Sequence, residues 1–434
     1  MNVFWFRRDL RLDDNAGLYY ALREGKPVLP VFIFDKNILE DLQDEDDARV
    51  TFIYDVLTGI DSELRKLGSS LHVYHDTPEN AFRKIITDFE VEKVFTNNDY
   101  ENYAIDRDSK IATLLAGKGI AFHSFKDQVI FDKDEVMKDD GSPYVVYSPY
   151  LRKWTSMLNN FYLSSYPNDK YFSNFAKVNV DAKFPTLTAI GFKRSTIEIP
   201  DSDPPVSIFK DYGKARDYPA QEGTSRLGIH LRFGTISIRE LVRKTQSLSS
   251  TYIHELVWRE FYHMIIYQFP HIGKGQAFKK EYDNIQWRND EKEFALWCEG
   301  KTGYPLVDAG MRQLNETGYM HNRVRMVTAS FLSKHLLIDW RWGEAYFARL
   351  LLDYDFANNN GGWQWAAGTG CDAAPYFRIF NPTTQAKKFD PDGKYIGKWV
   401  GEINSFDYPQ PIVEHTFARK RCLEAYSKAL KTSL

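Results

Sequence analysis

The chain begins MNVFWFRRDLRLDDN (residues 1–15), in which the apolar run Val3–Phe6 ends at a cluster of charged side chains. Continuous apolar runs of this kind are typical of strands that are buried on both faces. Helix-like stretches separate it from comparable runs at 28–34, 71–74, 91–96 and 121–125. This alternation predicts a doubly wound parallel sheet, the core of an α/β domain.

The charged residues after the first strand are the first candidates for function. Arg7, Arg8 and Asp9 follow the carboxyl end of that strand, which is where sheets of this class bind ligands. Charged loop residues are just as often simply solvated. No Gly-rich phosphate loop follows the strand, so the sequence excludes nucleotide sites of the GxGxxG and Walker types.

The period of the apolar residues changes to a helical one after about residue 205. Segments such as 252–268 and 321–335 have apolar residues at i, i+3 and i+4, and alternating strand patterns are almost absent. The preceding stretch contains several prolines and has no sustained period. The sequence therefore predicts an α/β domain over residues 1–130, a connector over 131–205 and an all-α domain over 206–434.

The composition excludes several classes of protein. The 434 residues include 30 Phe, 26 Tyr and 10 Trp, which a disordered chain would leave in water. No uncharged apolar run approaches the roughly 18 residues of a membrane span, and no export signal is found. Cys298, Cys371 and Cys422 are too far apart for a zinc site or a disulfide framework. We therefore expect a cytoplasmic protein that has no membrane span and binds no metal.

The charge is unevenly distributed. The net charge is −3, yet acidic residues are in excess before residue 200 and basic residues are in excess after it. Most of the Trp residues also lie in the second half. A basic, Trp-rich half is compatible with a polyanion or a stacking ligand, although a larger hydrophobic core would explain the Trp residues equally well.

One predicted helix, HELVWREFYHMI, combines several polar and aromatic side chains on one face. Glu255, Trp258, Arg259 and Tyr262 are spaced i, i+3, i+4 and i+7. A carboxylate beside a stacking ring suits a flat heterocycle that forms hydrogen bonds. The alternative is an ordinary amphipathic helix whose charges form ion pairs.

The segment DYDFANNNGGWQW (residues 353–365) is the second candidate. Its consecutive Asn and Gly residues predict a turn. Trp363 and Trp365 lie beside this turn, where a plain surface turn would waste two indoles. The segment therefore favours a ligand site over a structural turn.

Two shorter segments could bind anions. GTSRLG (223–228) offers hydroxyls, backbone N–H groups and a guanidinium to a phosphate, or it caps the next helix. HNRVR (321–325) opens a helix and allows the same two interpretations. Because no HExxH pattern, nucleophile elbow or catalytic triad is found, we expect the chemistry to belong to a bound cofactor.

Taken together, these segments resemble the cryptochrome/photolyase family, and specifically class I cyclobutane pyrimidine dimer (CPD) photolyases. The resemblance runs from FWFRRDLRLDDN to DYPQPIVEHTFAR and is densest over residues 212–395. It implies an α/β antenna domain, a connector and an α-helical domain that holds FAD. It also implies light-driven repair of UV-damaged DNA, in which excited, reduced FAD gives an electron to the dimer, the ring splits and the electron returns.

The resemblance assigns FAD contacts by position. They are Tyr212, Thr224, Ser225, Arg226, Leu227, Gly228, Arg259, Asn322, Arg325, Asp353, Asp355 and Asn359. The family usually has Ser where this chain has Gly228, so a backbone contact there would survive and a hydroxyl contact would not. Asn359 matches the residue beside flavin N5, where an amide can change its hydrogen-bond partner as N5 gains or loses a proton.

The resemblance also assigns substrate contacts and an electron path. The lesion and DNA contacts are Arg216, Glu255, Trp258, Tyr262, Asn322, Arg323, Met326, Trp365 and Gln385. Glu255 would form a hydrogen bond to a thymine carbonyl, and Trp258 would stack on the dimer. Trp287, Trp340 and Trp363 match the Trp chain that reduces FAD under light.

Several alternatives stay open. In folate-antenna relatives a Glu just after a Tyr-Glu pair contacts the pterin, but here Tyr100-Glu101 is followed by no carboxylate at that position, whereas Lys274 agrees with the folate pattern. A second antenna chromophore of the folate or deazaflavin type, another flavin, or none is therefore possible. A cryptochrome-like blue-light sensor is the rival function, although this chain keeps Glu255 and Trp258. Six-four photolyases have a His pair where this chain has His321-Asn322, which favours the CPD lesion. We expect a monomer.

Overall fold

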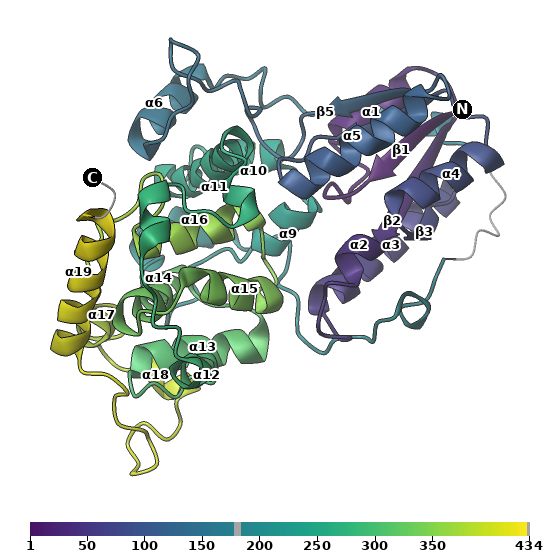
Figure 1. Cartoon of the computed structure of the whole chain (residues 1–434). Helices are drawn as coiled ribbons and strands as arrows, with labels where there is room; N and C mark the ends of the chain where they lie inside the picture. The colour runs from purple at the N-terminus through teal and green to yellow at the C-terminus, as the bar shows by residue number, and fades with distance from the viewer. Residues whose placement is uncertain (178–183, 432–434) are drawn as a thin grey trace. The chain divides into compact units, whose positions relative to one another are not determined.

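The computed structural model of the chain describes residues 1–177 and 184–431 (Figure 1). Its contacts divide the chain into two compact units, each assembled from several segments. The sheet unit comprises residues 1–136, 154–202 and 227–247, and the helical unit comprises residues 137–153, 203–226 and 248–434, where described. Among the described residues, no helix is both long and apolar enough to cross a membrane.

The sheet unit contains a parallel sheet with the order β3-β2-β1-β4-β5. Its strands are β1 (Asn2–Phe6), β2 (Val28–Asp35), β3 (His72–Asp76), β4 (Lys93–Asn97) and β5 (Ala121–Phe125). In β1, Phe4 and Phe6 belong to one hydrophobic core, and Val3 and Trp5 belong to another. Because successive side chains point to opposite faces, a strand between two cores needs a continuous apolar run. The predicted doubly wound α/β sheet is confirmed.

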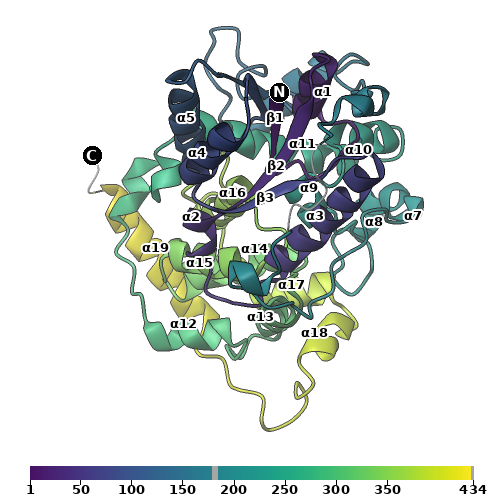
Figure 2. The same cartoon turned by 90° about the vertical axis from the view of Figure 1, so that its right-hand side faces the viewer.

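Helices cover both faces of this sheet. Residues of α4 (Pro78–Asp88) and α5 (Asn102–Ala116) join the core that contains Val3, whereas α1 (Ala16–Arg23) and α3 (Ala48–Lys66) join the core that contains Phe4. Figure 2 shows these two pairs on opposite sides of the strands. The other helical segments assigned wholly to this unit are α2 (Lys36–Leu39), η1 (Asn168–Asn174), η2 (Thr188–Ile190), α9 (Gly228–Phe233) and α10 (Ile238–Thr245).

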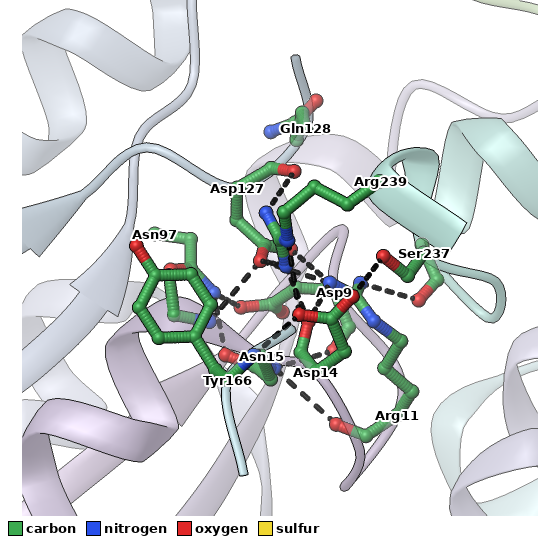
Figure 3. Close-up of polar contacts among 12 residues, drawn as sticks. Asp9, Arg11, Asp14, Asn15, Asn97, Asp127, Gln128, Tyr166, Ser237 and Arg239 are labelled. Atoms are coloured by element: carbon green, nitrogen blue, oxygen red, sulfur yellow. Dashed lines mark hydrogen bonds and ion pairs between the residues drawn. The ribbon is translucent and has the colours of Figure 1, made fainter. Parts of the chain in front are cut away.

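A buried network of charges joins α10 to the loops at the carboxyl ends of the strands (Figure 3). Arg239 of α10 donates to Asp14 and to Asp127, each at 2.9 Å. Asp127 also accepts a hydrogen bond from Arg11 at 2.7 Å, and Ser237 donates to Asp14 at 2.5 Å. Buried charges need such paired partners. The network explains why residues 227–247 belong to the sheet unit although they lie within the predicted all-α domain. The predicted boundaries of that domain stay a prediction.

The residues that follow β1 are internal. Arg8 is 8% exposed and donates to Asp99 at 3.1 Å and to Glu101 at 2.8 Å. Asp9 is buried, and burial raises its pKa above the ordinary value for an aspartate. Of the two interpretations offered by the sequence, solvated loop charges are therefore wrong for Arg8 and Asp9.

The helical unit contains α7 (Val206–Lys210), α8 (Tyr212–Ala215), α11 (Ser250–Gln268), η3 (Ile272–Lys274), η4 (Lys280–Asn284), α12 (Glu291–Cys298), α13 (Pro305–Thr317), α14 (Asn322–Ser330), the π-helical turn η5 (Phe331–His335), α15 (Trp340–Leu350), α16 (Phe356–Ala367), α17 (Pro382–Phe389), α18 (Lys394–Trp399) and α19 (His415–Lys431). The helix α6 (Tyr147–Met157) begins in this unit and ends in the sheet unit. The predicted helical half is confirmed.

The predicted turn over the Asn and Gly residues of 353–365 is wrong, because most of this segment forms α16. Asp355 caps the helix by accepting a hydrogen bond from the Asn358 N–H at 3.2 Å. Gly361 lies inside the helix, where a Cβ would be 2.3 Å from the ring of Tyr262 on α11. The glycine thus allows two helices to approach closely and does not mark a turn.

Candidate active site in the helical unit

The face of α11 that carries Glu255, Trp258 and Tyr262 is half-buried. Ser249 caps the helix, because its side chain accepts a hydrogen bond from the Tyr252 N–H and so fixes the first turn. The rings of Trp258 and Tyr262 are 5.5 Å apart and tilted by 31°. The structure therefore brings the carboxylate and the two rings onto one surface, as the sequence spacing predicts. Arg259, the neighbour of Trp258, is on the same helix.

Arg216 holds Glu255 in place. Its guanidinium donates to Glu255 Oε1 at 2.6 Å, and both side chains are between a quarter and a third exposed. Arg216 follows α8, and its guanidinium also lies 5.4 Å from the ring centre of Tyr212. An ionised carboxylate only accepts hydrogen bonds, whereas a guanidinium only donates them. The pair therefore offers both kinds of hydrogen bond at one point.

Sequence reasoning missed Tyr147, which lies directly on Trp258. The two ring centres are 3.6 Å apart, and the ring planes differ by 8°. Tyr147 is the first residue of α6 and lies in the segment that was expected to be a connector. No periodic pattern or motif marks this position, so the sequence carries no signal that would have found it.

Asn359 of α16 contacts a carboxyl group of α15. Its Nδ2 donates to Glu344 Oε1 at 2.9 Å and to the Glu344 carbonyl at 3.1 Å. Burial raises the pKa of Glu344 from 4.5 to about 7, and the hydrogen bond from Asn359 opposes this rise. Glu344 was also missed, because one carboxylate in an amphipathic helix is usually a surface residue.

Two aspartates directly precede α16. Asp353 accepts a hydrogen bond from Arg325 of α14 at 2.9 Å, and its other oxygen, Oδ1, is buried with no partner in the described part of the chain. Asp355 lies 3.3 Å from His263 Nε2 of α11. These contacts fix three helices relative to one another and leave one carboxylate oxygen that can accept a hydrogen bond from a ligand.

The segment before α9 presents hydroxyl groups beside tyrosines. Thr224 Oγ1 lies 3.0 Å from the Tyr319 hydroxyl, and Ser225 Oγ lies 3.1 Å from the Tyr252 hydroxyl. Arg226 has a φ of 52°, which is uncommon for a residue with a side chain. Leu227 and Gly228 follow but belong to the sheet unit.

Two polar residues at the start of α14 have partners within the helical unit. His321 caps the helix by accepting a hydrogen bond from the Arg323 N–H at 3.2 Å. The Arg323 guanidinium donates to Asp217 at 2.7 Å and lies 3.8 Å from the sulfur of Met326. Asn322 is exposed. Burial is the main reason that the pKa of His321 falls to about 4, so this histidine is neutral at physiological pH.

Three Trp residues that match the electron path share one hydrophobic core. Trp340 and Trp363 are buried in it, and Trp287 packs against it from a half-buried position. The ring of Trp363 lies 5.0 Å from Phe347 and 6.1 Å from Trp297. Gly343 allows this packing, because a Cβ there would be 2.1 Å from the Trp363 ring.

The remaining candidates lie on α16 and α17. Trp365 is 6.3 Å from Phe380, with the rings stacked, and Gln385 Oε1 on α17 is buried with no partner in the described residues. Trp365 and Tyr262 also line a cavity of about 20 Å³ together with Cys371.

Comparisons with known proteins agree on one family. A sequence profile described as the FAD binding domain of DNA photolyase matches residues 252–407, and one described as DNA photolyase matches residues 2–168. The deoxyribodipyrimidine photo-lyase of Halobacterium salinarum is 36% identical to this chain, and the alignment covers 99% of both.

Solved structures give the same answer. A class III photolyase from Agrobacterium tumefaciens is 33% identical with a TM-score of 0.84, over 99% of this chain and 98% of that one. An archaeal photolyase from Sulfolobus tokodaii is 35% identical with a TM-score of 0.82, over 99% of this chain and 100% of that one. The latter is described as holding two FAD molecules, with the implication of a novel light-harvesting cofactor. The chain therefore belongs to the photolyase/cryptochrome family and carries the FAD-binding domain of that family.

Proposed function

We propose that the protein is a class I deoxyribodipyrimidine photo-lyase, which uses light to split CPD lesions in UV-damaged DNA. The observation that carries this proposal is the surface of α11, where Glu255, its partner Arg216 and the ring of Trp258 lie together. An acceptor, a donor and a flat aromatic face are what recognition of a pyrimidine requires. The names of the similar full-length relatives support the same activity.

The residues assigned to FAD fit a flavin dinucleotide. Thr224, Ser225 and Arg226 offer hydroxyls and a positive charge, which suit a diphosphate. The partnerless oxygen of Asp353 suits a donor of the ligand, such as a ring N–H or a sugar hydroxyl, because a buried acceptor without a donor is costly. Bound here, FAD supplies the absorption of light and the electron for the substrate.

Glu255 and Arg216 divide the polar recognition of the lesion between them. The carboxylate can accept a hydrogen bond from the imide N–H of a thymine. Negative charge that grows on a thymine carbonyl needs a donor, and the Arg216 guanidinium beside Glu255 supplies one. This assigns to Arg216 the role that the sequence resemblance suggests for Glu255.

Asn359 is oriented by Glu344 before any ligand binds. Because its amide nitrogen donates to Glu344, its carbonyl oxygen is the atom that can accept a hydrogen bond from a flavin N–H. Glu344 therefore acts as a positioning residue for Asn359. Trp363, Trp340 and Trp287 would carry electrons through the shared core toward the flavin.

A substitution at Glu255 tests this proposal. Glu255→Ala should slow CPD repair roughly tenfold to a hundredfold, because it removes a hydrogen bond to a charged group, while the protein keeps its flavin. Loss of flavin from the variant would instead place Glu255 in the cofactor site. Action as a monomer in the cytoplasm stays a prediction, which sedimentation of the purified protein and fractionation of cells would test.

A further inference from the structure

The indole of Trp258 has two faces, and Tyr147 covers one of them. The ring centres are 3.6 Å apart, so no base can enter between the rings. Tyr147 is 7% exposed, whereas Trp258 is half-buried. A base that stacks on Trp258 can therefore use only the face turned away from Tyr147.

Tyr147 is held at two further points. Its hydroxyl donates to the carbonyl of His254, one turn before Trp258 on α11, at 2.7 Å. Its backbone N–H donates to Asp372 Oδ2 at 3.0 Å. Asp372 lies in the loop after α16 and also lines the cavity beside Trp365. Tyr147 thus contacts the turn of α11 that carries Trp258, and it also contacts the loop after α16.

The geometry of the ring pair depends on these two hydrogen bonds. Aromatic rings prefer offset or edge-to-face arrangements over a close parallel sandwich. A pair with centres 3.6 Å apart and an angle of 8° is close to a sandwich, so attraction between the rings alone does not select it. Fixing Tyr147 to His254 and Asp372 holds its ring, and the held ring restricts the rotation of Trp258.

We propose that Tyr147 is a positioning residue, which holds the indole of Trp258 in the orientation that stacks on the dimer. This inference rests on the proposed function, in which Trp258 binds the lesion. A ring that is already fixed loses less freedom on binding, which is worth roughly twofold to tenfold in affinity. Residues 137–153 lie within the predicted connector, and they then form one side of the substrate site.

The test is a double-mutant cycle on binding in the dark. The flavin-loaded protein and the variants Tyr147→Leu, Trp258→Leu and the double variant are titrated with a CPD-containing oligonucleotide and with its undamaged counterpart. The quantity compared is the ratio of the two affinities, because loss of general DNA binding affects both titrations. Tyr147→Leu should lower this ratio twofold to tenfold in the natural background and leave it unchanged in the Trp258→Leu background.

Two further variants separate positioning from a general structural role. Tyr147→Phe keeps the ring but loses the hydrogen bond to His254, so it should lower the ratio by less than Tyr147→Leu does. Tyr144→Leu alters a tyrosine of the same segment whose ring lies beside Tyr150, and it should leave the ratio unchanged. If Tyr147→Leu is not recovered folded, Tyr147→Met, which fills the space with a flexible chain, replaces it in the cycle.

The possible outcomes are distinct. A Tyr147→Leu ratio equal to that of the natural protein overturns the inference, and so does an equal loss in both Trp258 backgrounds. If Trp258→Leu itself leaves the ratio unchanged, the proposed role of Trp258 fails together with the inference. If Trp258→Leu lowers the ratio and Tyr147→Leu does not, only the role of Tyr147 fails.

Discussion

The substitution Glu344→Gln tests whether the carboxyl group beside Asn359 is protonated in the folded protein. Burial raises the pKa of Glu344 from 4.5 to about 7, so the folded protein takes up a proton that the unfolded chain releases between these pH values. The contribution of Glu344 to stability therefore falls as the pH rises through this window. The loss is complete above pH 7 and amounts to at most about 3 kcal/mol.

Glutamine keeps the oxygen that accepts the hydrogen bond from Asn359 but cannot ionise. The variant and the natural protein should therefore be about equally stable near pH 4.5. The variant should be more stable by up to about 3 kcal/mol at pH 8.5. Because every other titrating group is present in both proteins, the difference between them isolates Glu344.

The assay is urea unfolding of the two purified proteins, each loaded with flavin, at pH 5, 6, 7 and 8.5. The free energy of unfolding is compared at each pH, and the slope m shows whether the compactness of the unfolded state changes. A stability difference that stays constant between pH 5 and pH 8.5 would refute the reasoning. It would mean that Glu344 is ionised in the folded protein at every pH tested.

Further substitutions probe packing, the buried charges and the electron path. Gly361→Ala should cost roughly 1–3 kcal/mol of stability in thermal unfolding, because the new methyl would clash with Tyr262. The control Gly362→Ala should cost little, because a Cβ there meets no atom within 4 Å. Equal effects of the two substitutions would contradict the packing argument. Arg239→Met should destabilise the protein by roughly 3–5 kcal/mol in urea unfolding, because it removes the guanidinium that two buried aspartates share. A change below about 1 kcal/mol would speak against a paired network. Trp363→Phe should abolish the light-driven reduction of bound flavin by a thiol reductant, although the variant still shows the absorbance of bound flavin. Unchanged reduction would mean that Trp363 does not belong to the electron path. The logarithm of the DNA affinity should fall linearly with the logarithm of the salt concentration, and a flat titration would exclude a phosphate-binding surface.

The strands β1 and β2 could be predicted from sequence because an apolar run reports burial directly, whereas β3 is only half-buried and β5 is mostly exposed. β1 and β2 lie between two hydrophobic cores, so nearly every residue in them must be apolar, and the run itself is the signal. The face of α11 with Glu255 and Trp258 could also be predicted, because the helical period alone places these residues together.

The features that were missed depend on contacts between distant segments. The helix α16 was expected to be a turn, because the reason for Gly361 is the ring of Tyr262 on another helix. Tyr147 contacts Trp258 from a segment more than a hundred residues earlier in the chain. The raised pKa of Glu344 arises from burial, which no single residue in the sequence reveals.

Light-dependent restoration of damaged DNA tests the central claim most directly. The flavin-loaded, reduced protein is incubated with an oligonucleotide that contains one CPD, and with a matched one that contains a six-four lesion, under blue light and in the dark. The account predicts that intact thymines reappear from the CPD substrate under light only, and that the six-four substrate is unchanged. Absence of CPD repair by a protein that has bound and reduced FAD, or repair of the six-four lesion alone, would contradict it.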